Sequence, residues 1–106
     1  MKHIEDPNLI ASNFSEIAGA LAAAQDPQLI EEFLFSLLTK SETDEIAKRW
    51  ALVKDLASGT PQRQIAQNLG LSLCKITRGS RELKKPGSAF RRMLQIAGYE
   101  AASGEK

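Results

Sequence analysis

The feature that most constrains the fold is a pair of short amphipathic segments that meet at Gly70, within residues 62–81. Two short helices that cross steeply need a small side chain where they touch, and Ala66 occupies that position. The turn between them needs a residue that accepts a positive φ, which Gly70 provides. Apolar residues that would point into the shared core stand at Ile65, Leu69, Leu71 and Ile76. The pattern predicts a helix-turn-helix, and a helical hairpin of another kind remains the alternative.

The first half of the chain also has the pattern of helices. Asp-Pro pairs at 6–7 and 26–27 each place an N-cap acid before a proline at the first helical position. They predict helices over 7–24 and 27–38. The second of these is apolar around most of its circumference, and a chain of 106 residues is too short to bury such a helix on several sides. We therefore expect a homodimer.

Further start and stop signals divide the second half. Ser41 to Asp44 resembles a capping box and predicts a third helix from Ser41 to about Gly59. The remaining signals, in chain order, are a cap at Thr60-Pro61, a stop at Gly70, a start at Ser72, a break at Pro86-Gly87 and a last helix over 88–97. The predicted fold class is all-α, with about six helices in a single domain over 1–106. Its parts are dimerisation helices over 7–59, a helix-turn-helix over 60–84, a final helix over 88–97 and a flexible tail over 98–106.

The charges are segregated along the chain. The net charge is only +1, but residues 1–47 carry two lysines and nine acids, whereas residues 48–106 carry twelve basic residues and four acids. Between 61 and 92, eight basic residues accompany a single acid, Glu82. Such asymmetry is typical of a polyanion-binding half joined to a half with another role. A chance segregation of solvated charges is the alternative.

The outward positions of the predicted helix-turn-helix suit duplex DNA. Small, methyl-bearing and hydrogen-bond-donating side chains are those that a major groove accepts. Basic side chains nearby would hold the phosphates, as we expect of Lys85, Arg91 and Arg92. The candidate DNA-binding residues are Gln62, Arg63, Leu73, Cys74, Lys75, Thr77, Arg78, Arg81 and Lys84.

Other classes of protein find little support. The only histidine, His3, falls in an expected solvated N-terminal arm, and no carboxylate pair or Ser/His/Asp grouping appears, so we expect no enzyme and no catalytic residue. The single cysteine, Cys74, excludes an internal disulfide and a thiolate metal cage, and we expect neither a metal nor a cofactor. No apolar run approaches a membrane span and no signal pattern precedes residue 30, so we expect a cytoplasmic protein.

Gly79 stands in the middle of the predicted recognition helix, where a bulky apolar residue is usual. Glycine there costs about 0.5–1 kcal/mol relative to alanine, so something should compensate. Another body that closely approaches the backbone is the usual compensation. That body is either a neighbouring helix or a small flat ligand.

The sequence resembles the tryptophan repressor family. The resemblance covers roughly residues 34–94 and rests on Leu38-Thr39, Arg49, Gly59, Gln62-Arg63, the run from Ala66 to Gly70, and the run from Ile76 to Ser80. Thr-Arg-Gly-Ser inside a recognition helix is specific to that family. The resemblance implies an intertwined all-helical homodimer whose corepressor, L-tryptophan, lies between the recognition helix and the partner subunit.

The resemblance also implies roles for particular residues. Arg49 and Arg78 would sandwich the indole, Thr39 and Arg78 would hold the carboxylate, and Gly79 would let the ring approach. Carbonyl groups of Ser36 to Leu38 would meet the ammonium. Glu82 stands where the family usually has a serine that helps to hold the amino group. Its carboxylate would either pair with the ammonium or fill and repel the site.

Three functions follow. The leading hypothesis is a DNA-binding repressor that L-tryptophan gates, acting on genes of tryptophan or aromatic amino-acid metabolism. The second is a related DNA-binding regulator that is constitutive or answers another ligand. The third, of another class, is a helical protein-interaction module.

Overall fold

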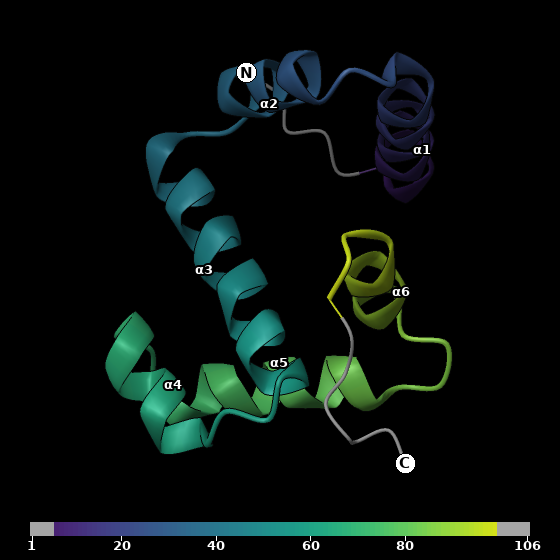
Figure 1. Ribbon diagram of the computed structural model, residues 1–106. Coiled ribbons are helices and arrows are strands. Elements are labelled where there is room, and N and C mark those ends of the chain that lie inside the picture. Colours follow the sequence, from purple (N-terminus) through teal and green to yellow (C-terminus); the bar gives the residue numbers. More distant parts are fainter. Residues whose placement is uncertain (1–5, 100–106) are drawn as a thin grey trace. The chain divides into compact units, whose positions relative to one another are not determined.

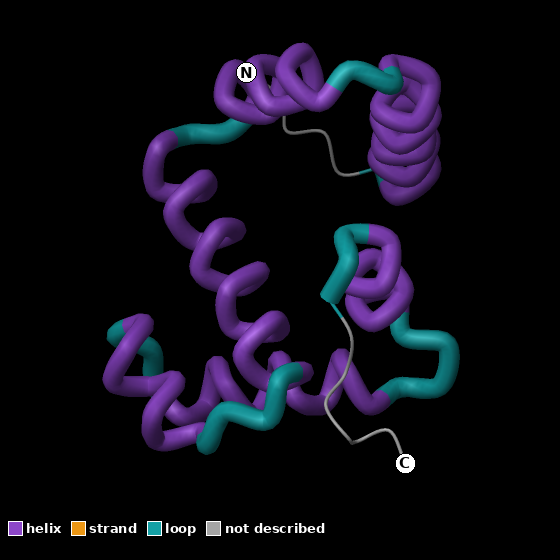
Figure 2. Tube along the Cα trace, viewed as in Figure 1, coloured by secondary structure: helices purple, strands orange, loops and turns teal. Residues whose placement is uncertain are grey.

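The computed structural model describes residues 6–99, and within them the chain is all-helical, with no strand (Figures 1 and 2). The predicted fold class is confirmed. None of the helices in the described range is long and apolar enough to cross a membrane. The six helices are α1 (Pro7–Ala24), α2 (Pro27–Leu37), α3 (Lys40–Ala57), α4 (Gln62–Leu69), α5 (Leu73–Lys84) and α6 (Ala89–Ile96).

The contacts divide the chain into two compact units, one that ends at Lys40 and one that begins at Ser41. The first unit contains α1 and α2, which contact each other. Their starts are as predicted, because the carboxylates of Asp6 and Asp26 accept hydrogen bonds from the first backbone amides of each helix. No residue of either helix is buried, and Phe14 is 73% and Phe35 61% exposed.

The second unit has a small core formed by α3 with the helices that follow it. One cluster joins Leu52 of α3 to Ile65 of α4 and Ile76 of α5. Another joins α3 to α5 and α6, and Trp50 packs against it. Figure 1 shows α5 crossing the C-terminal end of α3. The members of the second cluster are Val53, Ala57, Leu83 and Leu94.

The predicted helix-turn-helix is confirmed in its core and its turn. Ile65 and Ile76 are fully buried, and Ala66, Leu69 and Leu71 pack against them. Gly70 ends α4 with a φ of 64°, in the left-handed region that favours glycine. The hydroxyl of Ser72 accepts a hydrogen bond from the Lys75 amide and so caps α5.

Two predicted helix starts differ from the structure. α3 begins at Lys40, so Ser41 lies inside the first turn instead of capping it. Pro61 occupies the N-cap position of α4, where no side chain makes a capping hydrogen bond, so the cap expected from Thr60 is wrong. Both differences are smaller than one helical turn. Differences of a residue or two are usual at the ends of helices.

The C-terminal end of the described chain packs back on α3. Ser88, 5% exposed, caps α6 through a hydrogen bond from the Arg91 amide. Tyr99 donates its amide to the Leu94 carbonyl at 2.8 Å, and the Lys54 ammonium lies 5.2 Å from the centre of its ring. Tyr99 therefore has defined contacts although we expected it in the flexible tail. The rest of that tail, 100–106, and His3 lie outside the described residues.

Candidate functional site

An open groove lies between α3 and α5, and it brings together four of the seven residues predicted to hold a ligand. Arg49 comes from α3, and Arg78, Gly79 and Glu82 come from α5. The groove has a volume of about 670 Å³. The side chains of Leu52, Val53, Leu71 and Phe90 supply its apolar lining, so it offers both cationic and apolar surface to a bound molecule.

The other three residues predicted to hold a ligand lie elsewhere. Ser36 is in the last turn of α2, and Leu38 and Thr39 are in the connection to α3. All three belong to the first unit. The predicted ligand site is therefore divided between the two units of the chain, and the groove contains the part that belongs to the second.

Gly79 is buried, and its compensating neighbour is the protein itself. A Cβ atom at this position would meet the side chains of Leu52 and Leu56 on α3. Of the two explanations for this glycine, close approach of a neighbouring helix is the one confirmed. The expectation that Gly79 lets a ligand ring approach stays a prediction, and the residue does contribute to the wall of the groove.

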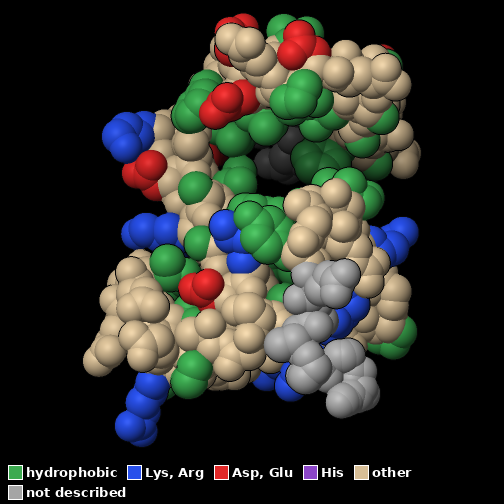
Figure 3. Space-filling view, viewed as in Figure 1, with side chains coloured by type: hydrophobic (Ala, Val, Ile, Leu, Met, Phe, Trp, Pro, Cys, Tyr) green, Lys and Arg blue, Asp and Glu red, His purple; other side chains and the backbone are tan. Residues whose placement is uncertain are grey.

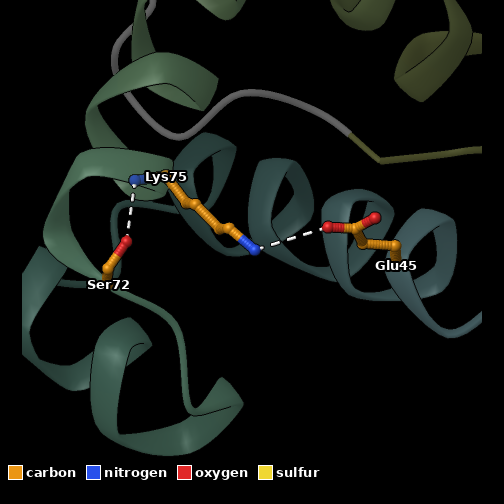
Figure 4. A network of polar contacts seen from close by, with 3 residues as sticks. All are labelled: Glu45, Ser72 and Lys75. Carbon is orange, nitrogen blue, oxygen red and sulfur yellow. Dashed lines mark hydrogen bonds and ion pairs between the residues drawn. The ribbon is translucent and has the colours of Figure 1, made fainter. Parts of the chain in front are cut away.

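Two ion pairs lie along the groove. The ammonium of Lys75 on α5 lies 3.4 Å from Glu45 Oε2 on α3, so this pair joins the two walls (Figure 4). Glu82 Oε2 lies 2.9 Å from the ammonium of Lys85, the residue that follows the end of α5. All four side chains are substantially exposed, so a charged ligand or a phosphate can compete for any of them.

A different face of α5 points to solvent and carries most of the predicted DNA contacts. Leu73, Cys74, Thr77 and Arg81 are exposed and line a shallow depression together with Arg78. Gln62 and Arg63 are exposed at the start of α4, and Lys84 is exposed at the end of α5. In the view of Figure 3, Lys and Arg side chains predominate over Asp and Glu on the surface of the second unit. This basic surface is the candidate nucleic-acid interface.

Two basic side chains differ from their predicted use. Lys75 turns toward Glu45 in the groove instead of toward the exposed face of α5. Arg91 is only partly exposed, and its Nη2 donates to the Leu83 carbonyl at 3.2 Å, where it satisfies the C-terminal end of α5. Arg92, by contrast, is exposed. Arg91 therefore contributes to holding α5, and its expected contact with the DNA phosphates stays a prediction.

Several groove residues were not predicted. Asp44, Glu45 and Lys48 line it from α3, and Phe90 lines it from α6. The spacing of the three charged residues with Arg49 and Leu52 places them on one side of a helix, which a helical projection would have revealed. That this side faces α5 depends on tertiary packing, for which the sequence has no local signal.

The family model described as "Trp repressor protein" matches residues 12–97, which includes both walls of the groove and the whole helix-turn-helix. The chain belongs to the Trp repressor family. It is therefore a transcriptional regulator of the Trp repressor type, and family membership favours this function over the protein-interaction module. The family is a regulatory, DNA-binding one, in keeping with the expectation that the chain is no enzyme.

Curated relatives agree with the family assignment. A Trp operon repressor homolog of Vibrio parahaemolyticus is 33% identical over 85 residues, which cover 79% of this chain and 82% of the relative. A homolog of Chlamydia caviae is 37% identical, over 65% of this chain and 69% of the relative. A homolog of Chlamydia trachomatis is 42% identical, over 58% of this chain and 68% of the relative. No solved structure matches the chain significantly.

Proposed function

We propose that this Trp repressor family member is a homodimeric repressor that L-tryptophan gates, that binds operator DNA through α4 and α5, and that acts on genes of tryptophan or aromatic amino-acid metabolism. The observation that carries the proposal is that Arg49 of α3 and Arg78 of α5 line one groove, directly behind the helix that bears the candidate DNA contacts. The names of the curated relatives, Trp operon repressor homologs, point to the same genes.

The groove has the chemistry for an aromatic amino acid. Planar guanidinium groups stack on flat rings and bind carboxylates, which suits Arg49 and Arg78 to the indole and the carboxylate of tryptophan. The carboxylate of Glu82 would pair with the ammonium of tryptophan in place of the ammonium of Lys85. Thr39 and the carbonyl groups of Ser36 to Leu38 would complete the site from the partner subunit of an intertwined dimer.

The dimer is supported by the apolar surface of the first unit. α1 and α2 have no buried residue, yet they carry several large apolar side chains that are between about a third and three quarters exposed. Patches of this kind usually mark interfaces. The large apolar side chains that are exposed on these two helices are Leu9, Ile10, Phe14, Leu29, Phe33, Leu34, Phe35 and Leu37.

The gate follows from the position of the groove. α5 is joined to α3 by small apolar clusters, by the close approach at Gly79 and by one exposed ion pair. A ligand between the two helices would fix their separation and with it the position of the DNA-contacting face. Ligand and DNA would then each raise the affinity for the other by one shared factor, as linkage requires.

A second candidate is a regulator that is constitutive or answers another ligand. Glu82 favours it, because its carboxylate already has a partner in Lys85 and adds negative charge to a groove that a carboxylate must enter. Such a protein would bind operator DNA equally well with and without tryptophan. The DNA interface would be the same in both candidates.

Calorimetry with L-tryptophan, with and without operator-like DNA, separates the candidates. The proposal predicts saturable binding that tightens when DNA is present. Glu82→Gln should weaken the binding of tryptophan. It should leave the binding of indole-3-propionate, which has no amine, nearly unaffected. Asp55→Asn, at a position of α3 that does not line the groove, is a control for the loss of one negative charge. Absence of heat at millimolar tryptophan with folded protein would favour the second candidate.

A further inference from the structure

The ion pair between Glu45 and Lys75 joins two helices with different roles. Glu45 lies on α3, and Lys75 lies in the first turn of α5, the predicted recognition helix (Figure 4). Thirty residues separate them in the sequence, so the pair depends on the packing of α5 against α3. This ion pair spans the groove, whereas the pair of Glu82 with Lys85 lies at the C-terminal end of α5.

The pair determines where the Lys75 charge lies. The backbone of Lys75 is fixed by the cap, since its amide donates to the Ser72 hydroxyl at 3.3 Å. Its side chain extends from there across the groove to Glu45 (Figure 4). Successive helix residues are rotated by about 100°, which puts Lys75 beyond Arg78 on the groove side of the surface formed by Leu73, Thr77 and Arg81. In the free protein its ammonium is therefore directed away from the face that would meet DNA.

We propose that Glu45 is a positioning residue that withholds Lys75 from DNA, so that a phosphate must displace the carboxylate before Lys75 can bind it. This inference rests on the proposed DNA interface of α4 and α5. A phosphate can displace it because the pair is weak: the two side chains are 58% and 53% exposed, and exposed ion pairs contribute little. The same weakness argues against the opposite role, a strut that holds α5 in its DNA-binding position.

The two roles predict opposite results for Glu45→Gln. If Glu45 withholds Lys75, the variant frees the lysine, and operator affinity without ligand rises about two- to fivefold per subunit at low salt, the range that an exposed pair allows. The plot of log affinity against log salt also becomes steeper, by at most about 0.9 per subunit, in proportion to the fraction of wild-type complexes in which Lys75 stays paired with Glu45. If Glu45 is a strut, affinity falls. Unchanged or reduced affinity overturns the proposal.

Three further variants separate this effect from simpler ones. Asp55→Asn removes the same charge from α3 at a residue that does not line the groove, so an effect of net charge alone would appear there equally. In a Lys75→Gln background, Glu45→Gln should no longer raise affinity beyond the Asp55→Asn control. Arg81→Ala should weaken DNA binding whatever Glu45 does. If it does weaken binding and the Glu45 effect survives the loss of Lys75, the withholding role fails while the interface stands. If neither Arg81→Ala nor Lys75→Gln alters binding, the interface fails and the inference fails with it.

Discussion

A methyl group on Gly79 would lie 2.9 Å from Leu52 Cδ2 and 3.3 Å from Leu52 Cγ, closer than packed carbon atoms normally approach. Leu52 is itself buried, at 2% exposure, between Ile65 and Ile76. The recognition helix can lie this near to α3 only because residue 79 has no side chain. The glycine is thus a packing requirement of the joint between the groove and the DNA-contacting face.

Gly79→Ala should therefore lower stability despite the better helix propensity of alanine. Overpacking typically costs about 1–3 kcal/mol, whereas the propensity gain is about 1 kcal/mol, so we expect a net loss of roughly 0–2 kcal/mol. In a Leu52→Ala background the clash is absent, and the same substitution should be neutral or stabilise by up to about 1 kcal/mol. Denaturant unfolding at one fixed protein concentration measures the effect of Gly79→Ala on the free energy of unfolding in each background. Equal effects in the two backgrounds would contradict the packing explanation.

Arg91 and Arg92 form a matched pair for a second prediction. Arg91 donates to the Leu83 carbonyl at the end of α5, so Arg91→Ala should cost about 1 kcal/mol of unfolding free energy. Arg92 is exposed, and Arg92→Ala should change stability by less than about 0.5 kcal/mol. Thermal or denaturant unfolding compares the two directly. If both variants unfold alike, the contact with α5 has no structural role.

Base contacts and phosphate contacts should respond differently to substitution. Arg63 is exposed at the start of α4, and Arg63→Ala should reduce the preference for operator over random duplex by about 1–3 kcal/mol if this arginine is bidentate to a guanine. Lys84→Ala should instead weaken binding to both duplexes and reduce the salt slope by about 0.9 per subunit. Binding titrations at several salt concentrations separate the two. Equal losses on both duplexes for Arg63→Ala would argue against base reading.

The exposed apolar side chains of α1 and α2 predict a dimer. At micromolar concentration the protein should sediment at twice the 11.6 kDa mass of the chain. Phe14→Glu, at a side chain that is 73% exposed in one chain, should shift the equilibrium toward monomer and lower the helical content. Ser15→Glu, on the same helix at an exposed polar position, should not. A wild-type protein that sediments as a fully helical 11.6 kDa species would rule out the intertwined dimer.

The sequence predicted most helix boundaries because their signals are local. The Asp-Pro starts of α1 and α2, the positive φ of Gly70 and the cap of Ser72 each depend on a few neighbouring residues. The start at Ser41 failed because adjacent polar residues offer more than one capping register.

The groove was predicted in part, and the missing part is tertiary. Arg49, Arg78, Gly79 and Glu82 were found through the family resemblance, and the structure brings them together. The partners of Lys75 and Arg91 lie thirty and eight residues away, at positions that no motif connects. In the sequence, Lys75 and Arg91 cannot be distinguished from the other basic residues of this region. Only the packing shows which basic side chains contact the protein and which remain available to DNA.

Operator affinity measured with and without L-tryptophan tests the central claim most directly. A labelled operator duplex is titrated with wild-type protein at fixed salt, at zero and at saturating tryptophan. The gated-repressor account predicts that tryptophan tightens binding about 5–150-fold, and that Arg49→Ala removes this effect while binding without ligand changes little. Identical operator affinity at zero and millimolar tryptophan, with protein that is folded and binds the duplex specifically, would contradict the account.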